Sequence, residues 1–203
     1  MKKTPKQERS KGLVDAIITG GIRILKEGNF EALTTSKISQ ISGVSVGSFY
    51  QYFKNKESVV TAVIEKVVED NVREILSKFD EVHDQTYEEM AVQLVDHLVD
   101  LFHRKKSAIR PLIENAAGLG GIKIEQRARK ILQRKLTEIL TERRFKPVGT
   151  SLESFVFILI NSVAGVLHGH ALENETGITR DEVKVELRRL VTGYMSKIET
   201  KVS

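Results

Sequence analysis

Apolar residues recur every three or four positions along most of this 203-residue chain. The longest such run, from Val59 to Phe79, is rich in valine, which is common in strands. Its period is nevertheless helical, and it contains Lys–Glu pairs and no turn residues, so we expect a helix from Asn55 to about Phe79. The same period predicts helices over residues 7–27, 86–104, 107–117 and 123–145. No segment has a strand pattern, and the sequence therefore predicts an all-α fold.

Three four-residue segments have the pattern of a capping box, in which a threonine begins a helix and a glutamate follows three residues later. They open the predicted fifth, eighth and ninth helices, and they are Thr86–Glu89, Thr150–Glu153 and Thr179–Glu182. Together with two short helices between residues 34 and 54, they bring the expected total to about nine helices.

Residues 34–56 predict two short helices joined by a tight turn at Gly43. Glycine adopts the left-handed conformation that ends a helix, and Ser45 can cap the helix that follows. Phe49 and Phe53, four residues apart, share the buried face of that second helix. This is the pattern of a helix-turn-helix, whose second helix enters the major groove of DNA.

The outward residues of this motif are the candidate DNA contacts. The second helix has no acidic side chain, and its hydroxyl and amide groups can bond to phosphates and base edges. The candidates are Thr34, Thr35, Ser36, Lys37, Ser45, Val46, Gly47, Ser48, Tyr50, Gln51, Tyr52 and Lys56. An ordinary pair of helices inside a bundle is the alternative for a short motif of this kind.

A longer string favours the DNA-binding interpretation. Around the motif the chain has Leu33-Thr34-Thr35, then Gly43-Val44-Ser45, then Phe49-Tyr50-Gln51-Tyr52-Phe53, and finally Asn55-Lys56-Glu57. Over these roughly 25 positions the chain resembles the TetR family of bacterial transcriptional regulators. One departure is that Ser39 and Ser42 stand where the family tends to have alanine.

The resemblance implies a three-helix DNA-binding head and a helical C-terminal body that dimerises and often binds a small effector. We place the head at residues 1–54 and the body at 55–203. The expected function is that of a homodimeric transcriptional regulator, a repressor released by its effector from a roughly palindromic DNA operator. The alternative is a DNA-bound interaction protein whose body docks a protein partner.

The charge distribution agrees with a nucleic-acid-binding head. Residues 1–56 contain ten Lys or Arg and four Asp or Glu, a net charge of +6, whereas the remainder has 22 basic and 23 acidic residues. The whole basic excess therefore lies in the segment that contains the motif, as expected of a protein that binds phosphates. The basic residues do not line one amphipathic helix, which argues against a membrane surface.

The predicted eighth helix is apolar nearly all round between Phe155 and Leu167. Such a helix must be covered on several sides, either within one chain or by a second copy. Small residues would allow another helix to approach closely, and the ninth helix has apolar residues at helical spacing. We expect a four-helix dimer interface, as the resemblance also implies, that includes Ser162, Gly165, Gly169, Leu187, Leu190 and Tyr194.

Three polar residues fall on otherwise apolar faces of the body. These are His97, Asn161 and His168. A buried polar group is either hydrogen-bonded within the protein or lines a ligand cavity. The resemblance places the effector pocket within the body, so these residues are our candidates for contacts to a mostly apolar, uncharged small molecule.

Other classes of protein receive little support. The chain has no cysteine, and His168 and His170 point in different directions on a helix, so we expect no metal and no cofactor. No constellation of residues indicates an enzyme. The basic N-terminus leads into no apolar signal core, and no run of about 18 apolar residues could span a membrane, so we expect a cytoplasmic protein.

Overall fold

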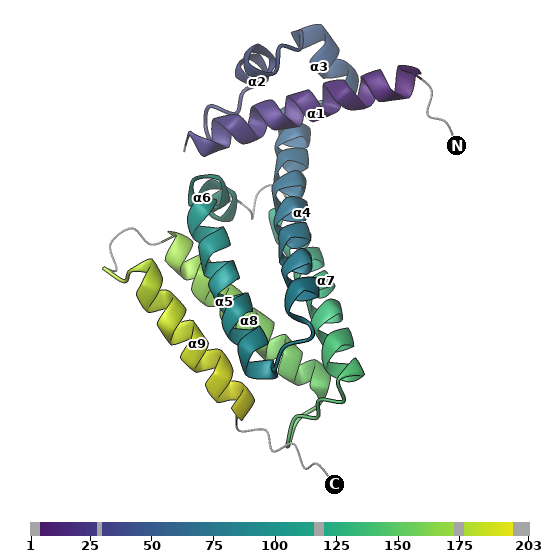
Figure 1. Cartoon of the computed structure of the whole chain (residues 1–203). Coiled ribbons are helices and arrows are strands. Elements are labelled where there is room, and N and C mark those ends of the chain that lie inside the picture. Colours follow the sequence, from purple (N-terminus) through teal and green to yellow (C-terminus); the bar gives the residue numbers. More distant parts are fainter. Residues whose placement is uncertain (1–4, 28–29, 116–119, 173–176, 197–203) are drawn as a thin grey trace. The chain divides into compact units, whose positions relative to one another are not determined.

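The computed structural model describes residues 5–27, 30–115, 120–172 and 177–196. This part of the chain forms nine α-helices and no strand, which confirms the all-α prediction (Figure 1). The helices are α1 (Pro5–Lys26), α2 (Thr35–Ser42), α3 (Val46–Tyr52), α4 (Lys56–Val82), α5 (Tyr87–Arg104), α6 (Lys106–Asn115), α7 (Gly121–Glu142), α8 (Leu152–Leu172) and α9 (Arg180–Ser196).

The helices form two compact units, and each has its own core. The first unit comprises residues 1–68 and 107–124, and the second comprises residues 69–106 and 125–203. The first unit thus includes α6 and the start of α7 in addition to the predicted head. The boundary between head and body at residues 54 and 55 stays a prediction about function, since α4 is one continuous helix that begins in the first unit and ends in the second.

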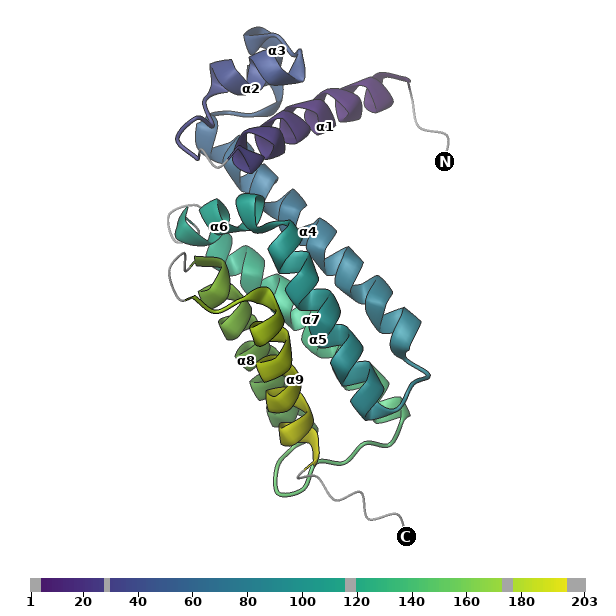
Figure 2. The same ribbon diagram turned by 60° about the vertical axis from the view of Figure 1, so that its left-hand side comes forward.

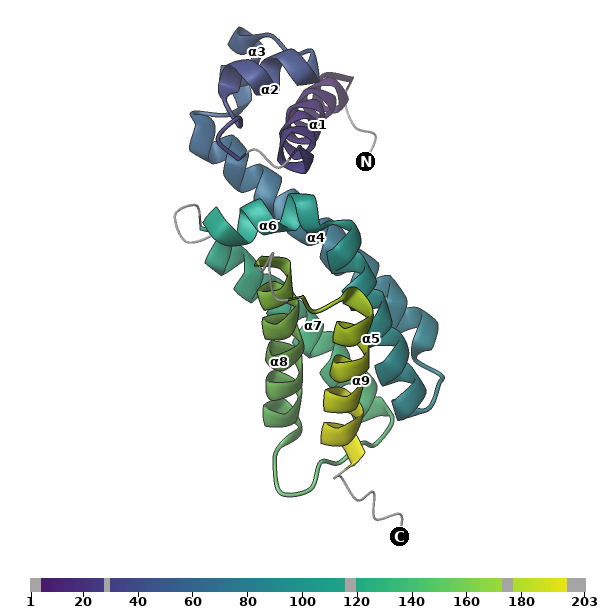
Figure 3. The same cartoon turned by 90° about the vertical axis from the view of Figure 1, so that its left-hand side faces the viewer.

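The core of the first unit lies among α1, α2, α3 and the first half of α4, and it also includes Leu112 of α6 and Ile124 of α7. Fully buried aliphatic residues of α1 and α4 surround Phe49 of α3, as the helical period predicted. α1 packs against α2, and α2 packs against α3, so the two short helices are held by their inner faces only (Figure 3). Their outer faces remain open.

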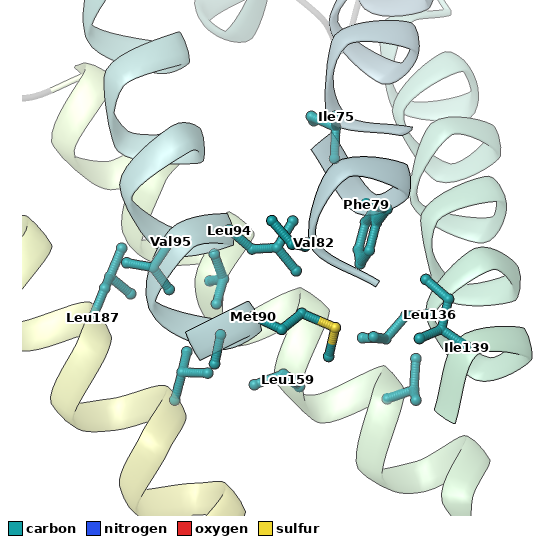
Figure 4. Packing of buried hydrophobic residues seen from close by; sticks show 14 of the residues in the cluster. Ile75, Phe79, Val82, Met90, Leu94, Val95, Leu136, Ile139, Leu159 and Leu187 are labelled. Carbon is teal, nitrogen blue, oxygen red and sulfur yellow. The ribbon is translucent and has the colours of Figure 1, made fainter. Parts of the chain in front are cut away.

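The core of the second unit is built from the second half of α4 together with α5, α7, α8 and α9. Figure 4 shows Phe79 of α4, Met90 and Leu94 of α5, Leu136 of α7 and Leu159 of α8 pointing toward one another. α9 lies beside α5 and α8 (Figures 2 and 3). Three ion pairs join α9 to α5, from Arg188 to Asp96 and from Lys184 and Arg180 to Asp100.

Most of the predicted helix caps are present, and they begin the helices at the predicted residues. Thr86 and Glu89 form the capping box of α5, and Thr179 and Glu182 exchange the same bonds at α9. The predicted N-cap of α8 was wrong by one residue. Ser151, and not Thr150, accepts the amide of Ser154, at 3.1 Å, so the helix begins at Leu152.

α8 also corrects the expectation about membrane-spanning segments. It is 21 residues long with a mean hydropathy of 1.7, so by length and composition alone it could cross a membrane. Six of its residues, among them Phe155, Leu159 and Leu167, are buried in the core of the second unit. We therefore interpret α8 as a core helix of the second unit.

Candidate nucleic-acid interface

The turn between α2 and α3 has the geometry that the sequence predicted. Thr34 caps α2 by accepting the amide of Lys37 at 3.2 Å. Gly43 ends α2 in the left-handed conformation, with φ of 70°, which a side chain would strain. Ser45 caps α3 and accepts the amide of Ser48 at 3.1 Å. These local bonds set the direction of α3 relative to α2.

The inner face of α3 fixes the helix on the first unit. Phe49 is fully buried, and its ring lies 5.6 Å from that of Phe53, which ends the helix. Behind them α1 passes close to its neighbours through two glycines. A Cβ atom built on Gly21 would lie 2.6 Å from the Cγ2 atom of Val63, and one on Gly20 would lie 3.2 Å from the Cβ atom of Ser42.

The outer face of α3 carries most of the predicted DNA contacts. The side chains of Tyr50 and Val46 are 55% and 46% exposed, Gln51 and Gly47 are exposed, and Ser48 is half-buried. The exposed side chains offer a phenol, an amide and an aliphatic group. This small, uncharged surface can approach a groove and present donors and acceptors to bases and phosphates.

The residues at the start of α2 flank this surface in the motif. Ser36 and Lys37 are exposed, and Thr35 is half-buried. Thr34 and Ser45 are exposed, but their hydroxyl oxygens already accept the capping hydrogen bonds. The hydroxyl of Ser45 also donates to Oγ of Ser48 at 2.9 Å, so a further contact from Ser45 to DNA uses the remaining lone pair of its oxygen.

Tyr52 does not belong to the outward set as the sequence analysis placed it. Its side chain is half-buried, and its hydroxyl donates to Oγ of Ser10 on α1 at 3.2 Å. Tyr52 lies two residues after Tyr50, about 200° around the helix, so it faces α1 when Tyr50 faces outward. We therefore assign it a role in holding α1 against α3.

Lysines near the end of the motif add positive charge beside this surface. Lys54 is exposed between α3 and α4, and Lys56 is half-buried at the first position of α4. Asn55 fixes this helix start, because its Oδ1 atom accepts the amide of Ser58 at 3.0 Å. The charge of Lys54 and its place beside the motif make it, like Lys37 and Lys56, a candidate for a phosphate contact.

Comparison with known families decides the identity of this fold. Residues 17–63 match the family model described as bacterial regulatory proteins of the tetR family. Residues 86–195 match the model described as the tetracyclin repressor-like C-terminal domain. This chain belongs to the TetR family. It is a DNA-binding transcriptional regulator, as the motif and its surface predicted.

Solved structures share the fold over nearly the whole chain. A transcriptional regulator from Rhodococcus sp. Rha1 has a TM-score of 0.71 at 14% identity, covering 91% of this chain and 97% of its own. A TetR-family regulator structure from Mesorhizobium loti has a TM-score of 0.70 at 15% identity, with coverages of 96% and 98%. The fatty acid degradation regulator FadR from Bacillus halodurans has a TM-score of 0.65 at 18% identity, with coverages of 95% and 97%. Among curated protein sequences none matches the chain significantly.

In the second unit of this TetR-family chain, α8 and α9 expose an apolar surface. Phe157 is 56% exposed, and Ile158, Val166 and Leu190 are also exposed. Ile158, Ser162, Leu190 and Tyr194 line a groove of about 440 Å³ on this surface. Among the predicted interface residues, Gly165 is exposed and Gly169 half-buried, and a Cβ atom on either would meet no atom within 4 Å.

Leu187 is the exception within the predicted interface. It is only 2% exposed and packs in the core of the second unit, so it is unavailable to a partner. The helical period identified an apolar face of α9 but could not distinguish the part that packs on α5 from the part that remains exposed.

The polar candidates for an effector site lie in two separate groups of contacts. Asn161 and His168 of α8 belong to a network with α7. Nη1 of Arg129 donates to Oδ1 of Asn161 at 3.1 Å, and Nη2 of Arg129 donates to Glu125 at 3.4 Å. Nδ1 of His168 lies 4.0 Å from the same carboxylate. Burial lowers the pKa of His168, and the charge of Arg129 lowers it further against the opposing effect of Glu125.

His97 belongs to the contact between α5 and α4. Its Nε2 atom is buried, lies 3.8 Å from Oε1 of Glu74 and makes no hydrogen bond within the described residues. Burial lowers the pKa of His97, the carboxylate of Glu74 raises it, and Lys78 and Arg104 lower it. Glu74 also accepts bonds from Arg104 and from Lys105, the latter at 2.8 Å. No described contact joins this group to Asn161 or His168.

No group of three metal-ligating side chains occurs among the described residues. Arg129, Glu125 and the ring of Phe102, whose centroid lies 5.7 Å from that of His168, were missed by the sequence analysis. Nothing in the sequence marks these residues, and only the structure brings Arg129 beside Asn161, and Glu125 and Phe102 beside His168.

Proposed function

We propose that this TetR-family regulator is a homodimeric repressor that binds a roughly palindromic operator through α3 of each subunit. The observation that carries the proposal is the outer face of α3, where Tyr50 and Gln51 are exposed on a helix fixed from behind by Phe49. A rigid helix that exposes donors and acceptors but no acid suits the major groove. A two-fold pair of such helices reads two symmetric half-sites.

Within this proposal the exposed residues have different roles. Gln51 has the paired donor and acceptor that recognise adenine, whereas the hydroxyl of Tyr50 positions the helix on a phosphate. Lys37, Lys54 and Lys56 bind phosphates and make affinity depend steeply on salt.

The exposed apolar surface of α8 and α9 supports dimerisation. Isolated apolar residues are common on protein surfaces, but a contiguous group beside a groove marks an interaction site. Gly165→Leu tests it sharply, because Gly165 is exposed and a Cβ atom there meets nothing within 4 Å. We expect monomers in sedimentation velocity and loss of operator binding, with unchanged helical circular dichroism. The control Arg73→Leu adds a leucine to an exposed site on α4 and should remain dimeric. A Gly165→Leu dimer of undiminished affinity would place the interface elsewhere.

We further propose that a small, mostly apolar effector with one or two hydrogen-bonding groups binds beside Asn161 and His168 in the cytoplasm and releases the repressor. The effector must bind the DNA-free and DNA-bound conformations with different affinity. Support comes from the half-buried network around Arg129, which a ligand amide or hydroxyl could enter.

The test of the proposed function uses the DNA upstream of the protein's own gene and of its neighbours. Full-length protein should bind one of these fragments with a steep salt dependence, and promoter activity in a reporter strain should rise when the gene is deleted. A compound that raises the dissociation constant should lose that effect in Asn161→Ala while operator binding is kept. Reporter activity that falls on deletion would identify an activator instead of a repressor.

A further inference from the structure

The outer face of α7 carries charges whose order is unfavourable for the helix itself. Its first turn has no acidic residue and its last turn has no basic one. Basic residues occupy the middle, with Lys130 and Arg134 exposed, and Glu138 and Glu142 follow, also exposed. A helix dipole favours acids near the N-terminus and bases near the C-terminus, and an i, i+4 pair favours the acid first. Helix stability therefore does not account for this arrangement.

These four side chains also form no close ion pair within the described part of the chain, although the charges of Glu138 and Glu142 help to raise the pKa of Lys135. Neighbouring charges are paired, as in Lys135 with Asp80 at 2.7 Å. By contrast, no ion pair within 4 Å is formed among the described residues by Lys130, Arg134, Glu138 or Glu142. Four exposed charges without a close ion pair, in the order basic, basic, acidic, acidic, therefore run from the middle of α7 to its end.

A groove lies along the same half of α7. It has a volume of about 480 Å³, and its lining includes Arg134, Glu138 and Glu142 of α7 together with Glu153 at the start of α8. Three carboxylates against one guanidinium make it an acidic groove. An acidic groove of this kind suits a basic helix surface. The middle turns of α7 form such a surface.

We infer that this surface binds the same surface of a second copy of the chain, with the two α7 helices antiparallel about a two-fold axis near Leu136. In that register Arg134 of one copy faces Glu138 of the other, and Lys130 faces Glu142. Because a two-fold contact is isologous, each pair occurs twice. The surface is made of different residues from the exposed apolar surface of α8 and α9. It therefore joins proposed dimers into pairs, or two monomers if that dimer does not form.

The experiment is sedimentation velocity on the full chain at low and high salt, over a wide concentration range. We expect an association step that is lost near 1 M NaCl, because the Debye length falls to about 3 Å. Arg134→Glu and Glu138→Arg should each raise the dissociation constant of this step roughly tenfold or more, since two ion pairs become two like-charge contacts. The matched control Arg73→Glu reverses an exposed charge on α4 and should leave the step unchanged.

The decisive variant carries both reversals in one chain. Arg134→Glu with Glu138→Arg restores opposite charges across the antiparallel contact, so association should return to within about threefold of wild type. Because Gly165→Leu abolishes the other proposed contact, the salt-dependent step should persist in that variant as a monomer–dimer equilibrium. An unchanged constant in Arg134→Glu, a doubly reversed chain that stays dissociated, or a wild-type protein of one mass at all salts overturns the inference.

Discussion

Replacement of Gly21 by alanine probes the packing that fixes the DNA-binding motif. The new Cβ atom would lie 2.6 Å from Cγ2 of Val63, about 1 Å inside the usual separation of roughly 3.5–4.0 Å between carbon atoms. Since Val63 is fully buried in the first unit, its methyl group has no open space to enter. Either α1 must shift away from α4 or Val63 must leave its rotamer.

Two opposing effects set the magnitude. Alanine is favoured over glycine in a helix by about 1 kcal/mol, whereas overpacking a core costs about 1–3 kcal/mol. We expect a net loss of about 1 kcal/mol in the free energy of unfolding, together with weaker operator binding. Gly12→Ala is the matched control on the same helix, because a Cβ atom there meets nothing within 4 Å. It should gain about 0.5–1 kcal/mol.

The assay is urea unfolding followed by circular dichroism, with Val63→Ala completing a double-mutant cycle. In the Val63→Ala background the clashing methyl group is absent, so Gly21→Ala should be neutral or stabilising, with a coupling energy of about 1–2 kcal/mol. If Gly21→Ala stabilises the wild-type protein as much as Gly12→Ala does, the close approach of α1 to α4 is refuted.

Three further predictions concern caps, phosphates and pH. Ser45→Ala removes the acceptor for the amide of Ser48 and should cost about 1 kcal/mol in urea unfolding, whereas Ser45→Asp should keep the cap but weaken DNA binding. Lys56→Ala should flatten the log–log salt dependence of operator affinity by about 0.9 in filter-binding titrations, and an unchanged slope would exclude a phosphate contact. Since burial lowers the pKa of His168 below 6.5, its neutral form stabilises the fold above pH 6.5, and that contribution should decrease as pH falls below this value. Urea midpoints between pH 5 and 8 should vary less in His168→Gln, and equal pH dependence would contradict this.

The elements that local chemistry controls could be predicted from the sequence. Thr34, Gly43 and Ser45 occupy the caps and turn expected of them, because capping depends on the neighbouring few residues. The buried positions of α4 followed from periodicity alone. The close packing at Gly20 and Gly21 could not be predicted in this way, since it depends on Ser42 and Val63, which are distant in sequence.

The errors arose where orientation depends on tertiary contacts. Tyr52 faces Ser10 of α1, a partner 42 residues away in sequence, and no local pattern reveals that bond. Leu187 is buried within its own chain although its spacing equally suits a dimer surface. The partner of Asn161, Arg129 on α7, is likewise distant in sequence and could not be predicted, whereas the role of Asn161 as an effector contact stays a prediction.

The most direct test of the account is selection of binding sites from a pool of randomised duplex DNA, with wild-type protein and Gln51→Ala in parallel. We predict that the wild-type protein enriches a roughly palindromic sequence. Gln51→Ala should lose preference at one base pair in each half-site, at a cost of about 1–3 kcal/mol on the wild-type sequence. No enriched sequence for wild type, or an identical preference in Gln51→Ala, would contradict the claim that the exposed face of α3 reads the operator through Gln51.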